Sequence, residues 1–191
     1  MPALFRRRFR GESAGFSLVE LMAVVTITGI LAALGVVLVR GHVNAAKTNR
    51  ALVGIQAIRV AEEQFRAQSG QYLSCSSFDT PAWFPMTAPG KVIYDWRPTG
   101  AHADKACWAR LSIPRTSGTQ YGYAVGAGRP GAVFPDDYPT LQTDTDPALP
   151  SPAPDLWYVI QVRGDVDGDG TPMKGVATSY NGEVYLEKET E

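Results

Sequence analysis

The amino-acid sequence predicts an α+β fold in which one long N-terminal helix is joined to a small antiparallel sheet. Three observations lead to this prediction: an apolar run near the start, a helical periodicity that continues beyond it, and short strand-like segments in the second half. With 191 residues, 45% of them hydrophobic, the chain is long enough for one globular domain and an appendage. Two sizeable domains are not expected.

The apolar run covers residues 16–39, which are 24 residues with one charged side chain, Glu20. As a helix rising about 1.5 Å per residue it would span roughly 36 Å, enough to cross a hydrocarbon layer of about 30 Å. Residues 1–15 precede it and carry four arginines against one glutamate. Because basic flanks stay in the cytoplasm, we expect residues 1–15 on the cytoplasmic side and the chain beyond Arg40 on the other.

Glu20 is the unusual residue of this run. A carboxylate at the centre of a spanning helix costs about 2.5–3.5 kcal/mol on insertion scales, so it implies a partner. Cleavage between Gly15 and Phe16 would create one, because the new ammonium group of Phe16 would lie one helical turn from Glu20, or would meet the same carboxylate of a neighbouring chain. The alternative is a plain single-pass anchor whose Glu20 reaches the lipid headgroups.

The sequence around this carboxylate, Gly15-Phe16-Ser17-Leu18-Val19-Glu20, resembles the class III signal and N-terminal helix of type IV pilins and type II secretion pseudopilins. In detail the resemblance covers about residues 6–70. It implies a pilin-like fold, cleavage after Gly15 by a prepilin peptidase, N-methylation of Phe16, and pairing of Glu20 with Phe16 of an adjacent subunit. Many major pilins carry proline where this chain has Val37, which favours a minor pilin or a pseudopilin.

The same resemblance implies a structural role rather than catalysis. The chain would be a filament subunit that polymerises through its N-terminal helix, held in the inner membrane as a single-pass protein before assembly and found afterwards in a periplasmic or extracellular filament. Its partners would be other pilin or pseudopilin subunits, the peptidase, an inner-membrane assembly platform and membrane lipid. A membrane-anchored module that binds or adheres through its exported domain is the second hypothesis.

Residues 40–70 are predicted to continue the helix as an amphipathic segment. Apolar side chains recur at intervals of three and four, while lysine and arginine occupy other faces. Ser69 and Gly70 predict the end of the helix after Gln68, because glycine readily adopts the left-handed conformation that follows a last turn. The apolar stripe predicts the face that packs on the sheet, and it comprises Ala45, Ala51, Leu52, Ile55, Ile58, Ala61 and Phe65.

Residues 71–191 are predicted to form the globular β-sheet domain. The first part, residues 71–90, looks irregular, and the stretch 129–154 is dense in proline and aspartate, which predicts a long surface loop. Asn181-Gly182 predicts a type I′ hairpin turn between the last two strands. The predicted strands are residues 91–96, 107–113, 120–125, 155–162, 176–180 and 183–186.

Cys75 and Cys107 are the only cysteines, and both follow the apolar run. Their spacing is not that of a CxxC metal or redox motif. Outside the cytoplasm they predict one disulfide that closes a loop of about 30 residues and contributes roughly 3–4 kcal/mol on the chain-entropy model. A pair of buried free thiols is the alternative, since the choice depends on the compartment.

Residues 165–171 place three carboxylates at alternate positions of a glycine-containing loop. Asp165, Asp167 and Asp169, with the backbone carbonyl of Thr171, match positions one, three, five and seven of a calcium loop. We predict a Ca²⁺ site here, with a solvated acidic turn between two strands as the alternative; some pilins and pseudopilins hold calcium in a C-terminal loop. Position twelve is Val176 instead of glutamate, so further ligands would come from Glu183, Asp144 or Asp146.

Charge and histidine content argue against two other classes of protein. Loss of residues 1–15 would change the formal net charge from −1 to −4, so bulk attraction to nucleic acid is not expected. The two histidines, His42 and His102, belong to no HExxH or GxSxG sequence, and both are expected at the surface. We therefore expect no enzymatic activity.

Overall fold

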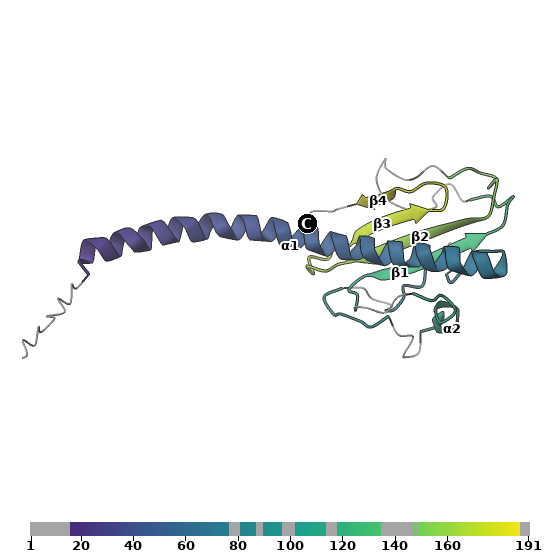
Figure 1. Ribbon diagram of the computed structural model, residues 1–191, viewed down its shortest axis with the longest axis horizontal. Helices are drawn as coiled ribbons and strands as arrows, with labels where there is room; N and C mark the ends of the chain where they lie inside the picture. Colours follow the sequence, from purple (N-terminus) through teal and green to yellow (C-terminus); the bar gives the residue numbers. More distant parts are fainter. Residues whose placement is uncertain are drawn as a thin grey trace, which may run out of the picture. The chain divides into compact units, whose positions relative to one another are not determined.

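Figure 1 shows the fold of the chain, a computed structural model. The chain divides into two compact units, residues 1–41 and 42–191, and each is described by itself. The structure describes residues 16–76, 81–86, 90–96, 102–113, 118–134, 147 and 149–187, without the side chains at positions 37, 38, 40, 41 and 44.

The first helix, α1, covers Leu18–Ser69, 52 residues that belong in part to each unit. At its start the hydroxyl of Ser17 accepts a hydrogen bond from the backbone N–H of Glu20 at 3.2 Å, as an N-capping residue does. At its end Gly70 has a φ of 75°, and its N–H donates to the carbonyl of Arg66 at 2.8 Å. The predicted long helix and its stop at Ser69-Gly70 are confirmed.

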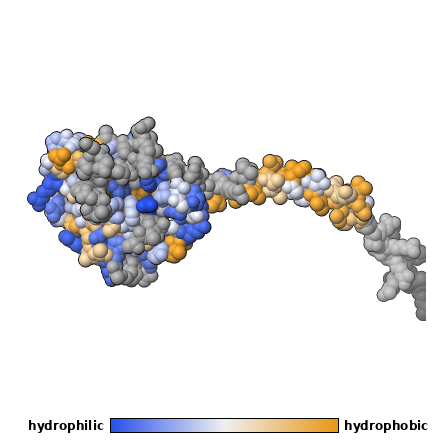
Figure 2. All heavy atoms as spheres, turned by 180° about the vertical axis from the view of Figure 1, so that it is seen from behind, coloured by the Kyte–Doolittle hydropathy of each residue, from blue (hydrophilic) through white to orange (hydrophobic). Residues whose placement is uncertain are grey.

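The first unit contains a segment, Leu18–Val36, that is long and apolar enough to cross a membrane. Its large apolar side chains are all between 52% and 76% exposed, and Figure 2 shows hydrophobic residues along this part of the helix. Two threonines are exceptions to its apolar character. The hydroxyls of Thr26 and Thr28 donate to the carbonyls of Met22 and Val24, each at 2.8 Å, so the helix itself satisfies these polar groups.

The second unit contains a four-stranded antiparallel sheet with strand order β1-β2-β3-β4. Each strand pairs with the next strand along the chain, so the sheet is a simple meander, and the predicted α+β class is confirmed. Four of the six predicted strands correspond to it, with ends displaced by one to three residues. The strands are β1 (Gly122–Gly128), β2 (Trp157–Gly164), β3 (Met173–Thr178) and β4 (Val184–Glu187).

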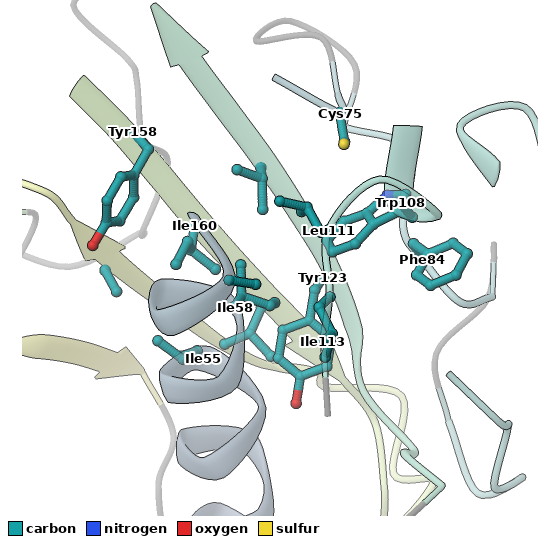
Figure 3. Packing of buried hydrophobic residues seen from close by; sticks show 14 of the residues in the cluster. Ile55, Ile58, Cys75, Phe84, Trp108, Leu111, Ile113, Tyr123, Tyr158 and Ile160 are labelled. Atoms are coloured by element: carbon teal, nitrogen blue, oxygen red, sulfur yellow. The ribbon is translucent and has the colours of Figure 1, made fainter. Parts of the chain in front are cut away.

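The main core lies between the second half of α1 and one face of this sheet. Figure 3 shows Ile55 and Ile58 of α1 facing Tyr123 of β1 and Ile160 of β2, and all four side chains are fully buried. The predicted stripe is confirmed for its buried members Ala51, Ile55, Ile58 and Ala61 and for the half-buried Phe65, which packs against them. Ala45, which the periodicity also assigned to the stripe, is exposed.

A second, smaller core cluster is built on other residues of the same strands. Trp157, Val159 and Val176 are buried together with Phe134 and Ala153, and the ring centroids of Phe134 and Trp157 are 4.7 Å apart. Backbone hydrogen bonds join the two ends of the proline-rich stretch. The N–H of Gly131 donates to the carbonyl of Ala153 at 2.7 Å, and the N–H of Ala153 donates to the carbonyl of Ala132 at 2.8 Å. Among the described residues of 129–154 there is no strand, as predicted.

The prediction of a strand at residues 91–96 is wrong. Only Tyr94 pairs there, through two backbone hydrogen bonds with Thr119 of 2.7 and 2.8 Å. Val92 and Ile93 are 60% and 62% exposed, so the alternating apolar residues do not line a buried face. Trp96, at the end of this stretch, is buried in the main core, but a stretch with no neighbouring strand gains little from forming a ladder.

The prediction of a strand at residues 107–113 is also wrong. The chain instead forms a short helix, α2 (Lys105–Trp108), and then continues without regular structure. Trp108 is buried by stacking on Phe84, with ring centroids 4.8 Å apart, and the apolar Leu111 and Ile113 are buried in the main core. Burial of these side chains by long-range packing produced the apolar pattern that we interpreted as a strand.

The predicted hairpin between β3 and β4 is present, but its turn is not type I′. The last paired residues are Ala177 and Val184, which leaves a loop of six residues instead of two. Gly182 does not have the positive φ that a type I′ turn requires. The guanidinium group of Arg59 in α1 donates to the carbonyls of Gly182 and Glu183 at 2.8 and 2.7 Å, which favours the longer loop.

The predicted disulfide is confirmed. Cys75 and Cys107 are bonded, with their Cα atoms 5.4 Å apart. The bond joins the stretch that follows α1 to the helix α2, and the N–H groups of Cys75 and Ser76 both donate to the carbonyl of Val125 at 2.9 Å. The disulfide therefore fixes the chain where it meets the edge of β1.

Candidate functional site

The N-terminal candidate site consists of Phe16 and Glu20. Phe16 directly precedes the capping residue Ser17 and is 84% exposed, while Glu20 lies in the first turn of α1 and is also exposed. A carboxylate in a first turn is favoured by the partial positive charge of a helix N-terminus. Among the described residues no side chain forms an ion pair with Glu20, and Gly15 lies outside them.

The acidic loop joins β2 to β3 and brings the three predicted aspartates together. One carboxylate oxygen from each of Asp165, Asp167 and Asp169 can be chosen so that all three lie within 4.8 Å of one another. Ca²⁺ binds oxygen atoms at about 2.3–2.6 Å, so three oxygens with this separation can contact one ion. The donor set therefore fits Ca²⁺.

Backbone amides already organise this loop. The carboxylate of Asp165 accepts hydrogen bonds from Gly168 at 2.6 Å and Gly170 at 3.1 Å, and Asp169 accepts one from Thr171 at 2.6 Å. Gly168 and Gly170 have φ values of 76° and 88°, which glycine adopts without strain. Partial desolvation acts to raise the pKa of Asp165, but the bonds from Gly168 and Gly170 act against it, and the net effect is a lowered pKa.

Of the other predicted calcium ligands, Glu183 is not grouped with the three aspartates. Glu183 lies in the β3–β4 loop, where its carboxylate accepts a hydrogen bond from the hydroxyl of Tyr185 at 3.0 Å. Asp144 and Asp146 lie outside the described residues. A strand, β3, follows the acidic loop, as the sequence predicted in place of the helix of an EF-hand. Within the described residues, the side chains grouped at this site are the three aspartates.

Sequence reasoning did not identify the exposed face of α1 in the second unit. Val53 and Val60, seven residues apart, are 66% and 52% exposed. A groove of about 590 Å³ and a second of about 560 Å³ both include Val60 in their walls. The first is lined by Asn49, Arg50, Val53, Gly54, Gln56, Ala57, Val60, Trp96, Gly118, Thr119 and Tyr123, and the second by Arg59, Val60, Glu63, Gln64, Ala67, Tyr158, Asn181 and Gly182.

Among the described residues, neither histidine forms an ion pair with an acidic side chain. His42 is exposed, as predicted. His102 is half-buried, which corrects the expectation of a surface residue: its Nε2 is 2.8 Å from the carbonyl of Trp83, and its Nδ1 accepts the N–H of Asp104 at 3.1 Å. These contacts fix the loop before α2.

Comparison with known protein families gives a match at the N-terminus. Residues 10–36 match the family model described as the prokaryotic N-terminal methylation motif. No curated protein and no solved structure matches the chain significantly. The matched residues include Gly15, Phe16 and Glu20 and most of the apolar helix of the first unit. The chain therefore carries the class III signal that is characteristic of type IV pilins and pseudopilins, and its architecture is pilin-like.

Proposed function

We propose that the protein is a minor pilin or pseudopilin, a structural subunit of a type IV pilus or a type II secretion pseudopilus. The observation that carries this proposal is the methylation motif at residues 10–36, with Glu20 as the lone carboxylate in the first turn of an apolar helix. The absence of proline at position 37 favours a minor pilin or pseudopilin over a major pilin.

Assembly follows from the chemistry of the N-terminus. A prepilin peptidase cuts after Gly15, and the ammonium group of Phe16, which becomes N-methylated, then lies at the start of α1. Paired with Glu20 of a neighbouring subunit, this ammonium compensates a carboxylate that apolar surroundings otherwise disfavour. The ammonium and the carboxylate can meet at only one offset of the two helices, so the pair also sets the register between neighbouring subunits. An inner-membrane platform supplies subunits that the apolar helix holds in the bilayer.

The exposed face of α1 in the second unit supports packing between subunits. Helices pack by fitting side chains of one face into grooves, and Val53 and Val60, seven residues apart on α1, lie beside two grooves. Contact with neighbouring subunits would remove these valines from water, which contributes about 25 cal/mol per Å² of apolar surface. The proposal thus assigns this face to the interior of the filament and the sheet to its exterior.

The acidic loop is proposed to bind Ca²⁺ in the exported domain. Support comes from the grouping of the three carboxylates and from the amides of Gly168 and Gly170, which hold Asp165 in place before any ion arrives. A bound ion would offset two of the three adjacent negative charges and fix the connection from β2 to β3. The role of the ion is therefore structural.

Glu20→Ala tests the assembly proposal. The variant should insert into the membrane as the wild type does but should not enter filaments, because the ammonium of the neighbouring Phe16 loses its partner. Thr26→Ala is the matched control, since Thr26 lies in the same helix and bonds to its own backbone. If Glu20→Ala enters filaments normally, the helix acts as a tether only, and a membrane-anchored binding module becomes the better description.

A further inference from the structure

Glu62 of α1 has its whole side chain inside the core of the second unit. Its exposed fraction is 0%, and its neighbours on the same face of the helix, Ile58 and Ala61, are buried in the main apolar cluster. Transfer of an ionised carboxylate from water into an apolar core is expensive unless charges or several hydrogen bonds compensate it. The environment of this carboxyl group therefore decides its protonation state.

The hydrogen bonds of Glu62 do not compensate a negative charge. Its Oε2 accepts the backbone N–H of Leu73 at 2.9 Å, whereas its buried Oε1 has no hydrogen-bond partner among the described residues. An ionised carboxylate offers about four acceptor sites, so a single N–H leaves most of them empty. The neutral carboxyl group, with less charge to solvate, suits this site better.

The charged and titratable groups around Glu62 give no stronger compensation. On α1, Arg59 uses its guanidinium group for carbonyls of the β3–β4 loop, and Glu63 adds a like charge. Arg66, one turn further on α1, directs its guanidinium group to Glu63 at 3.8 Å and to the hydroxyl of Tyr72 at 2.8 Å. That hydroxyl donates to Glu63 at 2.8 Å, and from β2 the phenol of Tyr158 lies in the same region. Burial, opposed by the Leu73 bond and reinforced by Glu63, raises the pKa of the Glu62 carboxyl to about 7.

The single hydrogen bond of Glu62 connects α1 to the stretch of chain that follows the helix. Leu73 belongs to the stretch in which the chain reverses after Gly70 and runs to the edge of β1. Two residues later, Cys75 bonds both to the carbonyl of Val125 and to Cys107. The bond from Leu73 to Glu62 therefore holds residues 71–75 against α1, between the end of the helix and the disulfide.

We propose that Glu62 is a proton-controlled latch, which keeps residues 71–75 closed on α1 while it is neutral and loosens them when it ionises and draws in water. The inference does not depend on the filament role. Because the closed form binds its proton more tightly than the open form, the closed form is favoured at low pH, and this advantage is lost as the pH rises from about 4.5 through 7.

Hydrogen exchange on the full-length chain in detergent micelles tests the latch directly. Between pH 5 and 9, after correction for the intrinsic exchange rate, protection of the amides in residues 71–75 should fall on the order of a hundredfold in the wild type. Glu62→Gln, which resembles the neutral carboxyl group in shape, should remove this pH dependence. Asp155→Asn, the matched control at an exposed carboxylate outside α1, should retain it.

Two results of hydrogen exchange would overturn the proposal: wild-type protection that does not change with pH, or a Glu62→Gln variant with the same pH dependence as the wild type. Infrared spectroscopy of the wild type keeps the test valid if the variant fails to fold. At pH 6 exposed carboxyl groups are ionised, since their ordinary pKa lies near 4.3. A buried, protonated carboxyl band that persists at pH 6 and disappears by pH 9 is expected, and its absence at pH 6 contradicts the latch.

Discussion

The phenol of Tyr123 in β1 lies against the backbone of Gly54 in α1, in the space that the Cβ atom of any other residue would occupy. Tyr123 is fully buried, and its hydroxyl donates to the carbonyl of Ala51 at 3.4 Å. The absence of a side chain at position 54 therefore lets α1 approach the sheet closely enough for a strand residue to reach the helix backbone. This contact fixes the position of the exposed face that we assign to subunit packing.

Gly54→Ala should lower the free energy of unfolding by about 1–3 kcal/mol, because the added methyl group overpacks a filled site. Denaturant unfolding of the full-length chain, followed by the fluorescence of its four tryptophans at positions 83–157, measures the change. Gly182→Ala is the control, since a Cβ there meets nothing within 4 Å. Equal unfolding midpoints for the two variants would show that the packing of Tyr123 against α1 does not require a glycine at position 54.

Reduction of the disulfide should destabilise the second unit. The bond joins residues separated by 32 positions, and closure of such a loop contributes roughly 4 kcal/mol on the chain-entropy model. The denaturant midpoint of the full-length chain should therefore fall when a reductant is added. The midpoint of the Cys75→Ser variant should be lower by the same amount without reductant. If reduction leaves the midpoint unchanged, the bond has no stabilising role.

Calcium binding is measured by isothermal titration of the full-length chain. Wild-type protein should release or absorb heat on addition of Ca²⁺, and Asp167→Ala should do so much less, because it removes one of three grouped carboxylates. Asp155→Ala, an exposed aspartate outside the loop, should behave as the wild type. No heat from either the wild type or the Asp167 variant would leave a solvated acidic turn as the correct interpretation.

Val53→Lys should reduce incorporation into filaments without loss of stability. Val53 is 66% exposed, so a lysine there costs little in the isolated subunit but would introduce a charge into a packed interface. Val133→Lys changes a valine that is 75% exposed and lies outside both grooves, and it should assemble normally. If Val53→Lys assembles while Glu20→Ala does not, the grooves are not the packing surface but the N-terminal mechanism stands.

Local patterns predicted the features that depend on neighbours in the sequence. An uninterrupted apolar run indicates a helix in the first unit, and Gly70 ends α1 because its φ of 75° suits glycine. The strands β3 and β4 were visible from their alternation and from the turn residues between them. The spacing of Phe16 and Glu20, and the three alternate aspartates of the acidic loop, were visible for the same reason.

Long-range packing decided the features that the sequence did not predict. Trp108 is buried because it stacks on Phe84, and no strand forms around it. Arg59 bonds to a carbonyl 123 positions away, and Glu62 looks like a residue of the polar face until the chain beyond Gly70 covers it. A periodic pattern reports which side chains are apolar, but it does not report what comes to lie against them.

Mass spectrometry of the mature N-terminus in protein isolated from cells tests the central claim most directly. The account predicts a chain that begins at Phe16 with a methyl group on its α-amine, since the ammonium there is what Glu20 of the next subunit requires. A mature chain that still begins at Met1 would lack this ammonium at the start of α1 and would contradict the proposed assembly.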